Sequence, residues 1–287
     1  MYLFKSFFIG NTRQAHWRKY ALTLALVLAA SVVPPAIAAQ TSCQGDCVAI
    51  GEWELSLSFG GGMRSNPVLG QKDIPFVLVP KFSYYGKRFF LDSYDAGYTL
   101  FDRQHHQFNA ILITPGFEQA FFSDWTLTNQ DIGDTGSTVH TLHKRRTAGL
   151  SGLEYTYIHP LFDWQTQILQ DVTGVHHGQK LRTALTLPWV KNRHYWELSA
   201  GATWQSDKLV DYYYGVRGNE VNNSELAYEA TATTSAYLKA EWETRFNKHW
   251  GMRAVTSYKW LGSSVIDSPI VIEDSIFTFY AAGVYHF

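Results

Sequence analysis

The chain has 287 residues and a formal net charge of -1, which suits two soluble domains or one large β-architecture. Aromatic residues make up 16% of it and charged residues only 17%, below the roughly 25% usual for soluble domains. This composition indicates that part of the surface faces something other than water. Without a basic excess, nucleic acid is not an expected partner.

The first 39 residues have the pattern of a secretory signal peptide. A basic stretch precedes an apolar run at residues 21–33, and Ala36 and Ala38 form a small-residue cleavage site. The apolar run is too short to cross a bilayer, which takes roughly 20 helical residues. We therefore expect a signal peptide at 1–39, a periplasmic segment at 40–51 and the mature fold at 52–287.

Cys43 and Cys47 are the two cysteines of the chain, and both lie just after the expected cleavage point. A local disulfide would be compatible with an oxidising periplasm, and free thiols remain the alternative. Structural zinc takes four ligands, so two thiols alone do not indicate a metal site. The sequence predicts no metal and no cofactor.

From Trp53 onward, apolar and polar residues alternate with the period of a β-strand. Near the C-terminus this alternation puts charged residues of both signs on one face of two successive segments, and we expect them to face the lumen of a barrel. These residues are Lys239, Glu241, Glu243, Arg245, Arg253 and Lys259. Selective pores normally use rings of one sign, so the mixture favours pairing across the lumen.

Aromatic residues at strand ends favour a membrane barrel over a soluble sandwich, since barrels carry aromatic girdles at both interfaces. The expected girdle residues are Trp53, Trp189, Trp196, Trp204, Trp250, Tyr258 and Trp260. The chain also ends inside a strand, with Phe279, Tyr285 and Phe287 on one face. That ending resembles the C-terminal signal that the barrel-assembly machinery recognises.

The alternation predicts an all-β fold, a transmembrane antiparallel up-and-down barrel of about twelve strands. The expected strand cores are 52–62, 75–85, 88–93, 96–101, 108–117, 147–158, 162–171, 179–189, 195–206, 234–246, 250–260 and 276–287. The connection at 93–95 is tight, and a single bulged strand there would give eleven. The long connections at 63–74, 118–146, 207–233 and 261–275 all fall on one side, which is expected to be extracellular.

Three residue patterns suggest catalysis or metal binding. Asp134-Thr135-Gly136-Ser137 resembles half of an aspartic-protease site, but the required second carboxylate motif is missing. Ser151, Glu154 and His159 offer the residue types of a lipid hydrolase without the spacing of a nucleophile elbow. Histidine pairs occur at 105/106, 140/143 and 176/177, and we expect them in turns and loops. The sequence predicts no catalytic residue.

Two blocks of short motifs resemble the MipA/OmpV family, the MltA-interacting proteins of the outer membrane. The first block comprises Gly60-Gly61-Gly62, Asn66-Pro67, Gly70, Asp73, Pro80, Tyr84-Tyr85-Gly86, Phe89-Phe90 and Gly97-Tyr98-Thr99-Leu100. The second comprises His143-Lys144-Arg145, Asp171-Val172-Thr173-Gly174-Val175-His176 and Gly178. The ending from Gly283 to Phe287 is also similar.

The resemblance implies an outer-membrane location in a Gram-negative bacterium and a scaffold that joins a murein lytic transglycosylase to a peptidoglycan synthase. It supplies no catalytic residues. We therefore expect a non-enzymatic scaffold or envelope-integrity protein in contact with outer-membrane lipid. The alternatives are a narrow channel for small solutes, an outer-membrane lipid hydrolase and a secreted soluble sandwich.

Overall fold

The computed structural model describes residues 50–122, 130–132, 137–139 and 144–287. The expected signal peptide, nearly all of the segment at 40–51 and both cysteines lie outside these residues. So do Asp134, Thr135 and Gly136 of the aspartic-protease motif, His140 and His143.

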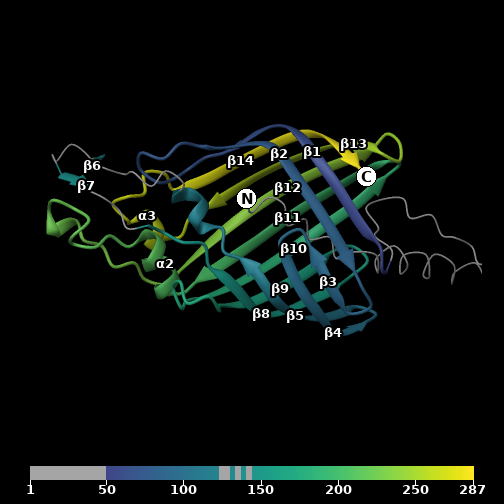
Figure 1. Cartoon of the computed structure of the whole chain (residues 1–287), viewed down its shortest axis with the longest axis horizontal. Helices are drawn as coiled ribbons and strands as arrows, with labels where there is room; N and C mark the ends of the chain where they lie inside the picture. The colour runs from purple at the N-terminus through teal and green to yellow at the C-terminus, as the bar shows by residue number, and fades with distance from the viewer. Residues whose placement is uncertain (1–49, 123–129, 133–136, 140–143) are drawn as a thin grey trace, which may run out of the picture.

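The described chain forms a closed barrel of twelve antiparallel strands (Figure 1), as the alternation predicted. Its strands are β1 (Trp53–Arg64), β2 (Ile74–Tyr85), β3 (Phe89–Asp92), β4 (Asp95–Arg103), β5 (His106–Pro115), β8 (Gly149–Ile158), β9 (Asp163–Asp171), β10 (Gln179–Lys191), β11 (His194–Gln205), β12 (Thr233–Arg245), β13 (Trp250–Trp260) and β14 (Ser275–His286). Each strand pairs with its neighbours along the barrel, and β14 pairs with β1 to close the wall. The short strands β6 (Gln130–Ile132) and β7 (Ser137–Val139) form a separate two-stranded sheet.

The tight connection between β3 and β4 is a true reversal of direction. Phe89 pairs with Tyr98 and Asp92 with Asp95, so the two strands are antiparallel. Ser93 turns the chain with a φ of 53°. The barrel therefore has twelve strands rather than eleven.

Alternation along each strand separates an outward apolar face from an inward polar one. In β12, Leu238 is 48% exposed, whereas its neighbours Lys239 and Glu241 are 6% and 2% exposed. Only a lipid environment makes a continuous belt of exposed apolar side chains stable around a closed sheet.

Two glycines of the wall lie beneath an aromatic ring of the neighbouring strand. Gly97 pairs with Phe90, and an added Cβ there would lie 2.2 Å from the Phe90 ring. Gly201 and Tyr237 form a second pair of this kind. Such aromatic cover replaces the packing that a glycine cannot supply in a curved sheet.

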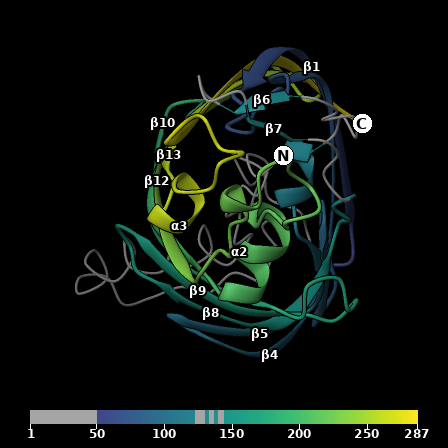
Figure 2. The ribbon, with the colours of Figure 1, turned by 90° about the vertical axis from the view of Figure 1, so that its left-hand side faces the viewer.

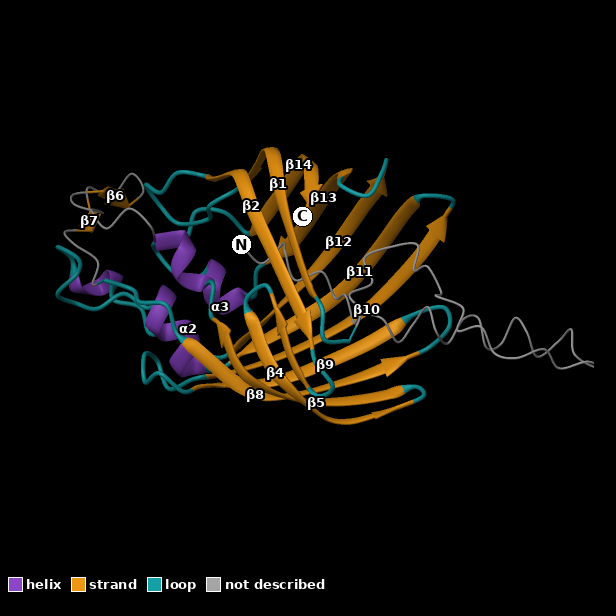
Figure 3. Ribbon diagram, turned by 45° about the vertical axis from the view of Figure 1, so that its right-hand side comes forward, coloured by secondary structure: helices purple, strands orange, loops and turns teal. Residues whose placement is uncertain are grey.

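The connections differ sharply between the two ends of the barrel. Short turns join the strands at one end, the periplasmic end in the usual orientation of bacterial barrels. The other end carries the long connections and all the described helices (Figure 3). They are η2 (Glu118–Phe122), α2 (Asp207–Tyr214), η4 (Ser224–Leu226) and α3 (Ser263–Ile266). Viewed from that end, α2 and α3 lie across the mouth of the ring of strands (Figure 2).

Candidate functional site

The periplasmic half of the lumen is filled by paired charges. Lys239 Nζ lies 3.1 Å from Glu197 Oε1 and 2.8 Å from Glu241 Oε2. Arg253 forms an ion pair with the other oxygen of Glu241. Nearer the end, Arg245 Nη2 donates to Glu54 Oε1 at 2.9 Å. Opposite charges therefore neutralise each other within β12, between neighbouring strands and, for Arg245 and Glu54, across two intervening strands.

The extracellular half of the lumen is tied to η2 by Glu118. This buried carboxylate forms an ion pair with Lys180 of β10 and accepts a hydrogen bond from Gln205 Nε2 at 2.9 Å. A second polar chain crosses the wall from β5 to β9. In it Glu154 accepts from Asn109 Nδ2 at 2.8 Å and from Gln167 Nε2 at 2.5 Å. Lys180 is fully buried and needs the Glu118 carboxylate, because a lone buried charge is strongly destabilising.

The described parts of the long connections pack into an apolar core that covers the extracellular mouth, which we call the plug (residues 65–73, 116–122, 206–232 and 261–274). Val68, Leu209, Val210, Tyr213 and Ile270 are all fully buried in it. Burial of each such side chain stabilises by about 1.5–3 kcal/mol. The mouth is thus closed by packing of the kind found in a soluble domain.

Backbone and side-chain hydrogen bonds join the connections within the plug. Leu69 N donates to the Ile270 carbonyl at 2.8 Å. Asn66 Nδ2 donates to the Phe121 carbonyl at 3.0 Å. From outside the plug, just before β8, Arg145 donates to the Gly215 carbonyl at 3.0 Å and lies 3.6 Å from the buried Glu220 carboxylate. Burial lowers the pKa of Arg145, and Glu220 opposes that shift.

The motif from Asp171 to Gly178 is a loop held by one carboxylate. Asp171 accepts hydrogen bonds from Thr173 N and Oγ1, His176 N and His177 N at 2.7–2.8 Å. The buried His176 accepts at Nδ1 from Gly178 N at 2.8 Å, so its ring is neutral at that nitrogen. Burial lowers the pKa of His176, while the charge of Asp171 opposes the shift. The loop thereby supports the start of α2, which packs against Gly178.

Exposed basic side chains gather on the periplasmic turns, which we call the rim. They are Lys87, Arg88, Arg103, Lys191, Arg193 and Lys248. Among the residues that the structure describes, the exposed carboxylates near these turns are Glu52 and Asp102. The described surface at this end is therefore basic, although the net charge of the chain is -1.

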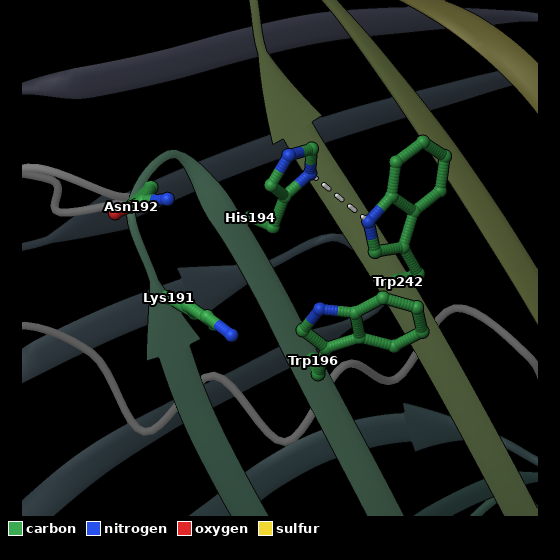
Figure 4. A pocket seen from close by; sticks show the side chains of 5 residues that line it. All are labelled: Lys191, Asn192, His194, Trp196 and Trp242. Atoms are coloured by element: carbon green, nitrogen blue, oxygen red, sulfur yellow. Dashed lines mark hydrogen bonds between the residues drawn. The ribbon is translucent and has the colours of Figure 1, made fainter.

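A shallow pocket of about 560 Å³ lies at the rim on the turn between β10 and β11 (Figure 4). Trp196 and Trp242 form its wall, with ring centroids 6.0 Å apart. Trp242 Nε1 donates to His194 Nδ1 at 3.3 Å, which fixes the indole beside the imidazole. Lys191 and Asn192 complete the pocket with an amine and an amide. The pocket combines flat aromatic faces with a positive charge.

The residues expected to form girdles lie at the two ends of the barrel wall. Trp53, Trp189, Trp196 and Trp250 belong to the periplasmic end, and Trp204, Tyr258 and Trp260 to the extracellular end. All but Trp204 are more than one third exposed. Phe279 and Phe287 of the C-terminal pattern are also exposed, and Tyr285 packs edge-on against Trp250 and Phe287. The expected lumen charges all lie on the inward face described above.

The structure separates the residues considered for lipid hydrolysis. Ser151 Oγ donates to the Ile111 carbonyl at 2.8 Å, and Glu154 is buried in the polar chain of the wall. His159 lies in a periplasmic turn, where its Nδ1 accepts from Leu161 N at 3.2 Å.

Within the described residues, no cluster of His, Cys, Asp or Glu could hold a metal ion. In that same part of the chain, no helix is long and apolar enough to span a membrane.

The sequence reasoning missed Glu118 and the plug. Glu118 lies in a long connection, where alternation gives no signal. The helix α2 did have one, because Leu209, Val210, Tyr213 and Tyr214 recur at helical spacing. Pro80 was a further signal. Because a proline cannot donate to a sheet ladder, it is typical of a strand with one side left unpaired.

Comparisons with known proteins agree with this architecture. The chain is 26% identical to outer membrane protein OmpV of Vibrio cholerae, over 92% of this chain and 99% of that protein. It is 25% identical to the MltA-interacting protein of Escherichia coli K12, over 78% of this chain and 86% of that protein. Among solved structures, the NanC porin matches 80% of this chain and 98% of its own with 10% identity and a TM-score of 0.39.

The protein-family model described as "MltA-interacting protein MipA" matches residues 57–287, which is nearly the whole barrel. The chain is an outer-membrane β-barrel protein and belongs to the MltA-interacting protein (MipA) family.

Proposed function

We propose that this protein is a non-enzymatic scaffold that holds peptidoglycan-remodelling enzymes at the inner face of the outer membrane. The observation that carries the proposal is the basic rim, which lies at the periplasmic end where murein enzymes work. The name of the relative from Escherichia coli, MltA-interacting protein, makes a murein lytic transglycosylase the first partner to test. A peptidoglycan synthase would be the second partner that the scaffold joins to it.

The short turns set the kind of contact that such a scaffold can make. They cannot enclose a partner, so binding has to use a flat surface with charge complementarity. An acidic face on the enzyme would be steered toward Lys87, Arg88, Lys191 and Arg193, with an association rate that falls as salt rises. The aromatic pocket beside Lys191 would add apolar contact area at one side of this surface.

Charge reversal of the rim tests the scaffold. With the barrel in nanodiscs, the lytic transglycosylase of the same organism should bind, and added salt should weaken that binding. The variant with Lys87→Glu, Arg88→Glu, Lys191→Glu and Arg193→Glu should bind at least about tenfold more weakly. A control variant with Lys72→Glu and Lys208→Glu reverses two exposed extracellular lysines and should bind like the native protein. Equal binding by both variants would contradict the proposal.

The plug and the neutralised lumen support a scaffold over a channel for small solutes. Single-channel recordings in planar bilayers separate the two, because a closed barrel should stay silent at moderate voltage. Stable conductance steps would favour the channel. Incubation with phospholipid and lipid A tests the hydrolase, and unchanged lipids would support the non-enzymatic role.

A further inference from the structure

The shortest ladder in the wall of the barrel joins β2 and β3, and we call this junction the seam. It has three residue pairs, from Ser83 to Tyr85, and β3 has only four residues. By contrast, β2 pairs with β1 from Trp53 opposite Tyr84 to Arg64 opposite Ile74, with one bulge between Phe59 and Gly62. Residues 74–82 of β2 therefore form a stretch of wall whose sheet register is with β1 alone.

The outer side of the β2 edge is apolar. Val77 and Leu78 are 54% and 56% exposed, as expected for side chains in contact with lipid.

Proline reduces the cost of this edge in an apolar medium. Ser93 N donates to the Phe82 carbonyl at 2.7 Å, so the polar backbone groups of Phe82 point toward β3. Two residues away in an extended strand, Pro80 points the same way, and it has no N–H to leave unsatisfied. An unsatisfied backbone donor in hydrocarbon is costly, which makes proline at this position a feature of a lasting edge.

Directly behind the edge, the lumen is apolar instead of charged. Phe76 and Val79 project inward from β2 and pack with Val255, Tyr280 and Ala282 of β13 and β14. This cluster interrupts the paired charges of Glu241 and Arg253 on the neighbouring part of the inner wall. An apolar inner surface beside a lipid-facing edge suits an apolar chain that enters from the side.

The η2 segment contacts both sides of this seam and is also held to the opposite wall of the barrel. At one side, Phe117 packs edge-on against Tyr94 in the turn between β3 and β4, with centroids 5.5 Å apart. At the other side, the Phe121 carbonyl accepts a hydrogen bond from Asn66, which lies just after β1. The ring of Phe121 lies 4.9 Å from the Arg64 guanidinium. Glu118 holds the segment to Lys180 on the opposite wall. The η2 segment thus bridges the two sides of the seam, and we call it the η2 flap.

We propose that the seam between β2 and β3 is a lateral binding site for the acyl chain of an outer-leaflet lipid. The chain passes beside Leu78 and Pro80 and rests on Phe76 and Val79. The η2 flap limits how deeply it enters. This site is separate from the rim, and it stands whether or not the protein is a scaffold.

Photo-crosslinking in lipid nanodiscs tests the site. A benzophenone amino acid replaces Val79, which faces the lumen at the seam, or Ala184, an apolar luminal residue in the continuous wall between β9 and β11. Replacement of the lipid-facing Leu78 is the positive control. We expect lipid adducts by mass spectrometry at Leu78 and Val79 but not at Ala184. The yield at Val79 should rise several-fold when Glu118→Gln releases the flap.

Adducts at Leu78 alone, in both backgrounds, would overturn the proposal, as would crosslinks from Val79 to protein instead of lipid. If the benzophenone at Val79 prevents folding, a nitroxide on Val79→Cys replaces it. The proposed site then predicts that the nitroxide collides more often with oxygen, which partitions into hydrocarbon, than with a water-soluble nickel chelate. The reverse order would equally overturn the proposal.

Discussion

Gly60 and Gly61 are adjacent in β1 but have opposite surroundings. A Cβ on Gly60 would lie 2.0 Å from the Ala281 carbonyl oxygen of β14, whereas one on Gly61 would meet nothing within 4 Å. The first glycine is needed where β1 closes against β14, and the second is not. The sequence shows only three glycines in a row and cannot distinguish them, because the distinction depends on the register of a strand over 200 residues away.

This difference predicts opposite results for two single-methyl changes. Gly60→Ala forces β1 away from β14 and should destabilise the barrel by about 1–3 kcal/mol. Gly61→Ala should leave stability unchanged. The measurement is the urea concentration at which half of the protein loses its fast-migrating, unboiled band. Equal midpoints for the two variants would contradict the assigned register.

His176 predicts a pH dependence confined to one loop. Its folded-state pKa lies below the ordinary value of 6.5, so folding favours the neutral ring. The contribution is full above pH 6.5 and is lost as the pH falls from there toward the folded-state pKa, when protonation removes the acceptor for Gly178 N. The protection factors of the amides at residues 172–178, which correct for the intrinsic pH dependence of exchange, should therefore fall between pH 7.5 and pH 5. His176→Asn keeps an acceptor oxygen near the position of Nδ1 without titrating and should abolish this dependence.

At the scale of elements, alternation predicted the strands because each wall has one lipid face and one polar face. It could not predict α2 or η2, which lie in connections and obey the packing of the plug. It gave β3 as 88–93 without revealing that the ladder to β2 is only three pairs long. Ladder length depends on which residues lie opposite each other, and a period of two leaves that open.

The anchor of η2 predicts a strong effect from one uncharged substitution. Glu118→Gln leaves the Lys180 amine buried without its carboxylate, a change that typically costs about 3–5 kcal/mol. Hydrogen exchange at residues 116–122 should rise, while exchange in β12 and β13 stays slow. The double variant Glu118→Gln/Lys180→Met should recover part of the loss.

Glu225→Gln is the matched control, because Glu225 is an exposed carboxylate of the plug. Slow exchange at η2 in the Glu118→Gln variant would show that the segment is held by other contacts.

For the whole molecule, the twelve-strand barrel, the long extracellular connections and the outer-membrane location were predictable from sequence. Twelve amphipathic strands, aromatic strand ends and a strand at the C-terminus leave few alternatives in a chain of this length. The closed mouth was not predictable, because the plug joins residues from four connections that are far apart in sequence. The basic rim became visible only once the turns were placed at one end.

Closure of the wall predicts that β14 is indispensable while parts of the plug are not. A chain that ends at residue 274 exposes the edges of β1 and β13 and should give no heat-modifiable band. Deletion of α3, residues 263–266, keeps all twelve strands and should retain that band. Electrophoresis with and without boiling distinguishes the two, and a folded band from the truncated chain would contradict closure by β14.

The pairing of β1 with β14 also constrains the life of the nascent protein. Its first strand must wait for its last, so no partial product released from the ribosome can bury its own edges. Until β14 is in place, the backbone groups at the edges of β1 and β13 must be satisfied by water or by another protein, so the barrel can close only around a chain that already includes β14.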